Sequence, residues 1–153
     1  MSELAPDTPP FLAPLAANLI ALRAKGNWSI AALAEQARVN PRMIRLVELG
    51  QTNVSLNTVD KLARALGVTT GSLVGSKPVA RQEGDALIEE VLARNLVSAR
   101  KGMKLTQDTL GQRSGVSMFV IAHIERQARN PSLQTLARLA AALDLSIEAL
   151  LTN

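Results

Sequence analysis

The sequence predicts an all-α protein built from two tandem copies of one small domain. Shifting the numbering by 77 places residues 18–75 on 95–152 without a gap, and 16 of the 58 aligned positions are identical. A repeat of this length indicates one structural unit present twice. Apolar residues recur in both copies at the i, i+3, i+4 and i+7 spacing of a helix. The chain is 47% hydrophobic but only 2% aromatic, which favours closely packed helices rich in Ala and Leu.

Proline, glycine and polar capping residues divide the chain into four parts. We expect a disordered N-terminal tail over 1–13, a first domain over 14–75, a linker over 76–84 and a second domain over 85–153. The tail contains three prolines and no helical period, which is typical of a segment that lacks a packed core. The apolar period of the second domain already starts near Asp85, so its first helix is predicted to begin there.

Each copy is predicted to contain five helices. In the first copy we expect helices over 14–25, 30–37 and 41–49, a fourth that follows Ser55 and ends before Gly67, and a short fifth after Thr69. Ser, Thr and Asn side chains accept hydrogen bonds from the free N–H groups of a helix start, and proline suits the first turn. The second copy repeats this order, with predicted caps at Thr106, Ser117, Ser132 and Ser146.

The second and third helices of each copy are joined by a three-residue turn. In the second copy Gly115 supplies the positive φ that such a turn needs. The first copy has Arg38 at this position, and there we expect a left-handed conformation at a penalty of roughly 1 kcal/mol. A helix pair of this kind presents one face of its second helix outward, and that face can enter the major groove of DNA.

The residue inventory argues against several classes of protein. The chain has no Cys, no Tyr and one His, so disulfides, cysteine metal sites and Ser-His-Asp catalysis are hard to build. We therefore expect no enzyme activity, no metal and no cofactor. No apolar run reaches the roughly 18 residues of a membrane span, and no basic region precedes the N-terminal apolar stretch. We accordingly expect a cytoplasmic protein without a membrane partner.

Positive charge is concentrated on the two repeats. Residues 18–75 carry seven basic and three acidic side chains, and residues 95–153 carry seven and four. Such a distribution suits a polyanion such as DNA, although a charge of this size is also ordinary for a soluble domain.

The second copy contains a set of short motifs at fixed spacing. They are Leu-Thr-Gln-x-x-Leu (105–110), Gly-Val-Ser (115–117), Ile-x-x-Ile-Glu (121–125), Asn-Pro-Ser-Leu-x-Thr-Leu (130–136) and Leu-Ala-x-Ala-Leu (139–143). With them the copy resembles the Cro/C1-type (XRE) helix-turn-helix family of phage repressors and bacterial regulators. The first copy departs at Ile30, where the family usually has Gln, and at Arg38, where Gly is usual. The resemblance implies two tandem lambda-repressor-like five-helix domains whose third helices read DNA.

The resemblance also assigns roles to equivalent positions of the two copies. Base-facing or groove-facing positions are taken by Ile30, Asn40, Pro41, Arg42 and Leu46, with Arg45 close by, and by Gln107, Ser117, Met118, Phe119 and His123. Phosphate-contacting positions fall in the loops Gln51–Asn53 and Ala128–Asn130, the second of which contains Arg129. The pairs Arg23/Glu48 and Arg100/Glu125 match a structural ion pair of the family.

Several of these residues have more than one reasonable role. Arg42 and Arg45 can each hydrogen-bond guanine through two N–H groups, or they can lie on a solvated face. Gln107 can support a base-reading residue or bind phosphate. His123 can contact phosphate or a base, or it can be an ordinary surface residue.

Met118 and Phe119 stand where polar residues are more useful for reading DNA. Helical geometry places Ile121 and Ile124 on the core side, so Met118 and Phe119 are expected to be exposed. They can contact thymine methyl groups, pack beneath the preceding helix, or form an apolar patch for another protein or a second copy of this chain. From the sequence we favour a protein contact.

These observations predict a sequence-specific DNA-binding transcriptional regulator that is a monomer or a homodimer. Its partner is double-stranded DNA, and because its two recognition helices differ, the two half-sites should differ as well. The alternative is a protein-binding antagonist, of the antiactivator or antitoxin-like kind. In that case one domain, the second above all, would grip a protein regulator.

Overall fold

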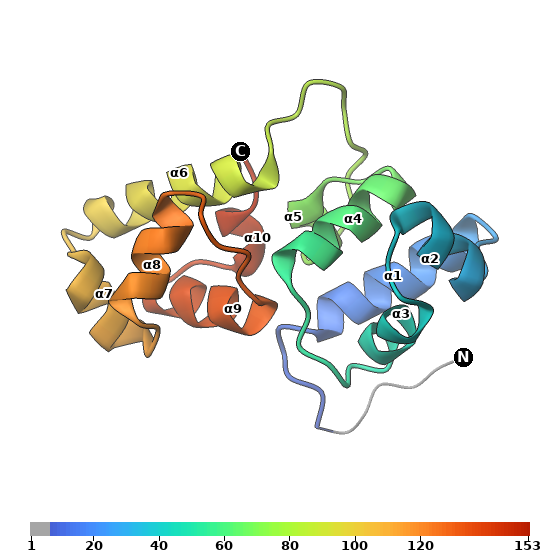
Figure 1. Ribbon diagram of the computed structural model, residues 1–153, viewed down its shortest axis with the longest axis horizontal. Helices are drawn as coiled ribbons and strands as arrows, with labels where there is room; N and C mark the ends of the chain where they lie inside the picture. The colour runs from blue at the N-terminus through green and yellow to red at the C-terminus, as the bar shows by residue number, and fades with distance from the viewer. Residues whose placement is uncertain (1–6) are drawn as a thin grey trace.

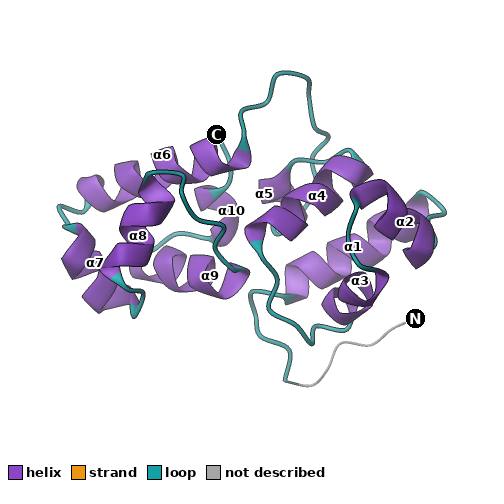
Figure 2. Cartoon of the chain, in the orientation of Figure 1, coloured by secondary structure: helices purple, strands orange, loops and turns teal. Residues whose placement is uncertain are grey.

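The computed structural model describes residues 7–153, and over this range the chain forms ten helices in two halves (Figure 1). Domain 1 contains α1 (Ala13–Lys25), α2 (Ile30–Ala37), α3 (Pro41–Glu48), α4 (Leu56–Leu66) and α5 (Thr70–Leu73). Domain 2 contains α6 (Ile88–Gly102), α7 (Gln107–Ser114), α8 (Met118–Glu125), α9 (Leu133–Ala142) and α10 (Ile147–Leu150). Figure 2 shows helices joined by loops throughout the described part of the chain. The predicted all-α class with five helices per copy is confirmed.

Polar side chains cap most helices where the sequence predicted them. Ser29 accepts a hydrogen bond from Ala32 N–H (3.0 Å) at the start of α2, and Thr69 caps α5 in the same way. The start of α6 was predicted wrongly. It begins at Ile88, because the carboxylate of Asp85 accepts a hydrogen bond from Gln82 N–H (3.1 Å) and so belongs to the preceding loop.

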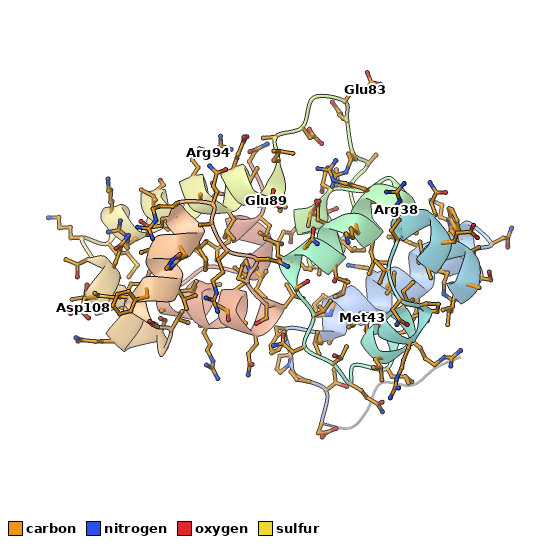
Figure 3. The ribbon with its side chains drawn as sticks, in the orientation of Figure 1. Arg38, Met43, Glu83, Glu89, Arg94 and Asp108 are labelled. Carbon is orange, nitrogen blue, oxygen red and sulfur yellow. The ribbon has the colours of Figure 1, made fainter. Side chains whose placement is uncertain are left out.

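The repeat extends to backbone conformations that are rare for ordinary residues. Four turn positions have positive φ in both domains, and they are the pairs Asn27/Lys104, Arg38/Gly115, Gly50/Gln127 and Gly67/Asp144. Arg38 adopts the left-handed conformation expected of it, with φ 58° and ψ 46°, and Gly115 has φ 75° and ψ 11°. The turn between the second and third helices therefore has similar geometry in both domains, whichever residue stands there. Figure 3 labels Arg38 at the surface of domain 1.

The predicted N-terminal tail is wrong for the residues that the structure describes. Leu12 is only 2% exposed and belongs to the core, and Phe11 packs against that core. A hydrogen bond from Leu12 N–H to Pro9 O (2.9 Å) turns the chain into α1. The apolar pair Phe11-Leu12 has enough surface to anchor this segment, which the proline content alone did not reveal. The remainder of the predicted tail, residues 1–6, lies outside the described residues.

The two domains meet through the N-termini of α4 and α9. Leu56 N–H donates to Pro131 O (2.8 Å), and the equivalent Leu133 N–H donates to Val54 O (2.8 Å). These reciprocal bonds form an isolated antiparallel bridge between Ser55 and Ser132. The donor of each bond is equivalent to the donor of the other, 77 positions along the chain, and the same holds for the two acceptors. The contact therefore has the form of a two-fold interface within one chain.

The short helices α5 and α10 continue this domain interface. A Cβ atom added to Gly71 would lie 2.6 Å from Thr152 Oγ1 and 2.9 Å from Leu151 O. The equivalent contact places the carboxylate of Glu148 against Gly75. Domain 1 thus presents glycine where domain 2 presents larger side chains, and all four residues of α5 are buried. The pairing is symmetric in its backbone arrangement and complementary in its side chains.

The connection between the domains is partly fixed on domain 1. Thr69 N–H donates to Val79 O (2.8 Å), and the guanidinium of Arg81 donates to Val68 O (3.1 Å). The predicted linker 76–84 is therefore anchored in its middle, and the loop that follows carries Glu83 at its outer edge (Figure 3). The middle of the linker therefore belongs structurally to domain 1.

Candidate nucleic-acid interface

In domain 1 the exposed face of α3 carries hydrogen-bonding and positively charged groups. Ile44 and Val47 are fully buried and hold the helix on the core, which leaves Arg42 and Arg45 exposed on the other side. Asn40 caps the helix, and its Oδ1 accepts a hydrogen bond from Arg42 N–H (2.8 Å). The amide Nδ2 of this cap and two guanidinium groups are consequently available at one helix end, which suits hydrogen bonding to base edges or phosphates.

In domain 2 the equivalent face of α8 is apolar at its start. Ile121 and Ile124 are buried as the anchors of the helix, while Phe119 is 67% and Met118 40% exposed. Ser117 caps the helix by accepting a hydrogen bond from Phe119 N–H (3.2 Å), so its hydroxyl proton remains available to an acceptor. Both apolar residues are exposed as predicted, and they do not pack beneath α7.

The half-buried His123 lies one turn further along α8. Its Nδ1 is 2.5 Å from Phe119 O, so the ring is tied to its own helix. In the neutral tautomer that donates this hydrogen bond, Nε2 is an acceptor. A role of His123 in DNA binding remains a prediction.

Both predicted ion pairs are present, and each ties α3 or α8 to the first helix of its domain. Arg23 binds Glu48 through two hydrogen bonds (2.8 and 2.9 Å), and Arg100 binds Glu125 in the same way (2.7 and 2.9 Å). The side chains of Glu48 and Glu125 are 3% and 8% exposed, so each carboxylate needs its partner. These bidentate pairs fix the angle of the recognition helix in each domain.

Gln107 joins the second of these pairs. Its Nε2 donates to Glu125 Oε1 (3.1 Å), whereas the equivalent position of domain 1 is the apolar Ile30. Burial alone would raise the pKa of Glu125, but the hydrogen bonds from Arg100 and Gln107 and the charge of Arg100 outweigh it and lower the pKa. The structure thus gives Gln107 a supporting role beside α8, and contact with phosphate stays a prediction.

The loops after α3 and α8 hold the predicted phosphate contacts, and two of these residues have another partner. Asn130 Oδ1 accepts a hydrogen bond from Asn57 N–H (2.8 Å), and Asn53 Oδ1 accepts one from Gln134 N–H (3.2 Å). Each Asn therefore caps the fourth helix of the other domain, a role that the sequence analysis missed. The one available signal was that Asn stands at this position in both copies. DNA contact by Asn53 and Asn130 remains a prediction.

The exposed polar and basic residues near the recognition helices are placed differently in the two domains. Gln51 and Arg129 are exposed in their loops, as is Arg126 at the C-terminal end of α8. Near the recognition helices, domain 1 has Arg42 and Arg45 on α3 itself, whereas domain 2 has Arg126 and Arg129 at the C-terminal end of α8 and beyond it. Arg45 of α3 is replaced in α8 by Ala122. The two recognition helices consequently offer different chemistry to a ligand.

Residues 7–153 contain neither a cluster that could hold a metal ion nor a helix that could span a membrane. No group of three or more His, Asp or Glu side chains there is arranged to hold a metal ion. None of the helices in the same range is both long and apolar enough to cross a bilayer.

Comparison with known proteins agrees with this geometry. The sequence profile of the helix-turn-helix family matches twice, over residues 19–73 and 96–150. The control protein C.SmaI of Serratia marcescens is 43% identical over 66 residues, which cover 43% of this chain and 79% of that protein. The immunity repressor protein of Bacillus phage phi105 is 37% identical over 59 residues, covering 39% of this chain and 41% of that protein. No solved structure matches this chain.

Each profile match begins within the first helix of a domain and ends in its fifth, so both domains are covered almost completely. With α2–α3 and α7–α8 as its two helix-turn-helix units, the chain belongs to the Cro/C1-type helix-turn-helix family of DNA-binding transcriptional regulators.

Proposed function

We propose that this protein is a single-chain regulator whose two domains bind one asymmetric double-stranded DNA site as a fixed unit. The observation that carries the proposal is the two-fold domain interface. Because equivalent residues exchange places across it, the recognition helices α3 and α8 are related by the same approximate two-fold axis. Two-fold related recognition helices suit two half-sites separated by roughly one turn of DNA, about 34 Å.

The side chains of the two recognition helices support an asymmetric site. Arg42 and Arg45 on α3 have no counterparts of like chemistry on α8, where Phe119 and Ala122 stand. A palindromic site would present the same base edges to both helices, although they differ in charge and polarity. The two half-sites are therefore expected to differ in sequence.

The test starts with the selection of bound duplexes from random DNA by the full chain, followed by insertions between the two half-sites. A fixed unit loses affinity when half a helical turn (about 5 base pairs) is inserted, and also when a full turn (about 10 base pairs) is inserted. A flexible tether would restore binding at the full turn, because both half-sites then return to one face. Recovery of full affinity with the longer insertion would contradict the fixed unit. Failure to select any duplex would contradict the DNA-binding function itself.

A further inference from the structure

Two exposed apolar side chains, Met118 and Phe119, form the start of α8, which we call its tip. Phe119 has the highest exposure among the exposed large hydrophobic side chains of residues 7–153, and Met118 is next to it. Exposing a phenyl ring to water is unfavourable, so its place at the tip calls for a contact that covers it.

The shape of the tip is held by the close approach of α7. A Cβ atom added to Gly111 would lie 2.8 Å from Val116 O, so a larger residue there would push the start of α8 away. With Gly115, Gly111 lines a shallow open hollow beside Met118 and Phe119. The apolar tip is thus a fixed protrusion on a supported helix, as insertion into a groove requires.

The position of the tip on the recognition helix favours DNA as the partner that covers it. Phe119 aligns with Arg42 and Met118 with Pro41, so the tip of α8 occupies the place that the start of α3 occupies in domain 1. Under the proposed function both domains bind one duplex, so DNA seated on α3 also meets the tip of α8. The exposed Arg126 and Arg129 lie at and beyond the other end of α8, where positive charge suits phosphate groups on either side of a groove.

Among base edges in the major groove, thymine alone presents a methyl group, and apolar side chains read it by contact. We infer that Phe119 and Met118 make domain 2 a reader of thymine methyl groups, while Arg42 and Arg45 make domain 1 a reader of guanine. The asymmetric site then has a guanine-containing half under α3 and a thymine-containing half under α8. This inference rests on the proposed function and adds the base preference of each half-site. It replaces the protein contact that the sequence alone favoured.

The test uses the full chain and the duplex selected from random DNA. Replacing each thymine of the α8 half-site by deoxyuridine removes the methyl group and leaves every hydrogen-bonding group in place. Loss of one buried methyl contact is expected to weaken binding about fourfold. Replacing guanine of the α3 half-site by 7-deazaguanine removes one acceptor of the two-bond contact and is expected to weaken binding about tenfold.

Protein variants show which side chain is responsible. In Phe119→Ala the effect of deoxyuridine should shrink to the part that Met118 contributes, while the effect of 7-deazaguanine persists. Arg42→Ala should show the reverse pattern. Leu87→Ala is a matched control, because Leu87 is also exposed (55%) but lies just before α6 and not on a recognition helix. It should retain the wild-type response to both base analogues.

The outcomes separate the inference from the function on which it rests. If no duplex is selected, the DNA-binding function fails. If a duplex is selected but deoxyuridine has no effect, or has the same effect on Phe119→Ala as on the wild type, domain 2 does not read thymine methyl groups and the inference is wrong. Unchanged affinity of Phe119→Ala for the selected duplex would mean that the tip meets a different partner, such as a protein.

Discussion

The reciprocal caps at the domain interface give a measurable contribution to stability. Asn130 Oδ1 accepts the N–H of Asn57 at 2.8 Å, and this N–H is one of the groups at the start of α4 that no residue of the helix itself can satisfy. Loss of such a cap costs about 1 kcal/mol. For a chain of this size, 1 kcal/mol lowers Tm by roughly 2–4 °C. We expect Asn130→Ala to show this loss in thermal unfolding followed by circular dichroism.

Two related variants make the experiment specific. Asn53→Ala removes the equivalent cap of α9, where the hydrogen bond to Gln134 N–H is longer (3.2 Å), so it should cost as much as Asn130→Ala or less. Asn57→Ala is the matched control, because Asn57 is an exposed Asn at the same helix start whose backbone alone takes part in the cap. If Asn130→Ala lowers Tm no more than Asn57→Ala, the interdomain cap contributes nothing and the reasoning is refuted.

Three further predictions concern other parts of the structure. Gly71→Ala should lower the free energy of unfolding by about 1–3 kcal/mol in urea titrations, because the new methyl group meets the backbone at Leu151 O. A variant more stable than the wild type would show that the two domains move apart readily at this contact. The pKa of Glu125 is lowered in the folded protein, so its ionised carboxylate stabilises the fold fully above about pH 4.3, and this stabilisation is lost as pH falls through the folded pKa. The difference in free energy of unfolding between wild type and Glu125→Gln should therefore narrow in acid. Arg38→Gly should stabilise domain 1 by a few tenths to about 1 kcal/mol, because it relieves a left-handed φ of 58°, and a clear loss of stability in the same titrations would mean that Arg38 makes a compensating contact.

The local structure of each domain could be predicted from the sequence because its determinants are local. Ser29, Ser55 and Ser132 cap helices a few residues away, and apolar residues at helical spacing define the buried faces. The exposure of Phe119 followed from the burial of Ile121 and Ile124 on the same helix. Two predictions failed because a periodic pattern does not show these contacts. Leu12 is buried beside residues far along the chain, such as Gly50, and Asp85 accepts a hydrogen bond within its own loop.

Part of the candidate site depended on partners far apart in the sequence. The Arg100–Glu125 pair could be expected from a family motif, but the hydrogen bond from Gln107 to Glu125 required the fold. Asn53 and Asn130 were expected in phosphate-contacting loops, and their loops are indeed exposed. Their actual hydrogen bonds join residues 81 and 73 positions away, on the other domain.

The sequence by itself determined that there are two domains, where their helices lie and which side chains their recognition helices expose. Only the tertiary structure decided how the two domains face each other. That arrangement is made by free N–H groups at the starts of α4 and α9 and by the fit of Gly71 and Gly75 against Leu151, Thr152 and Glu148. Backbone N–H groups have the same chemistry in every sequence, so their partners leave no signal in the sequence. A glycine that allows another segment to come close can be recognised only once that segment is in place. The relation between α3 and α8 is therefore a property of the packed chain.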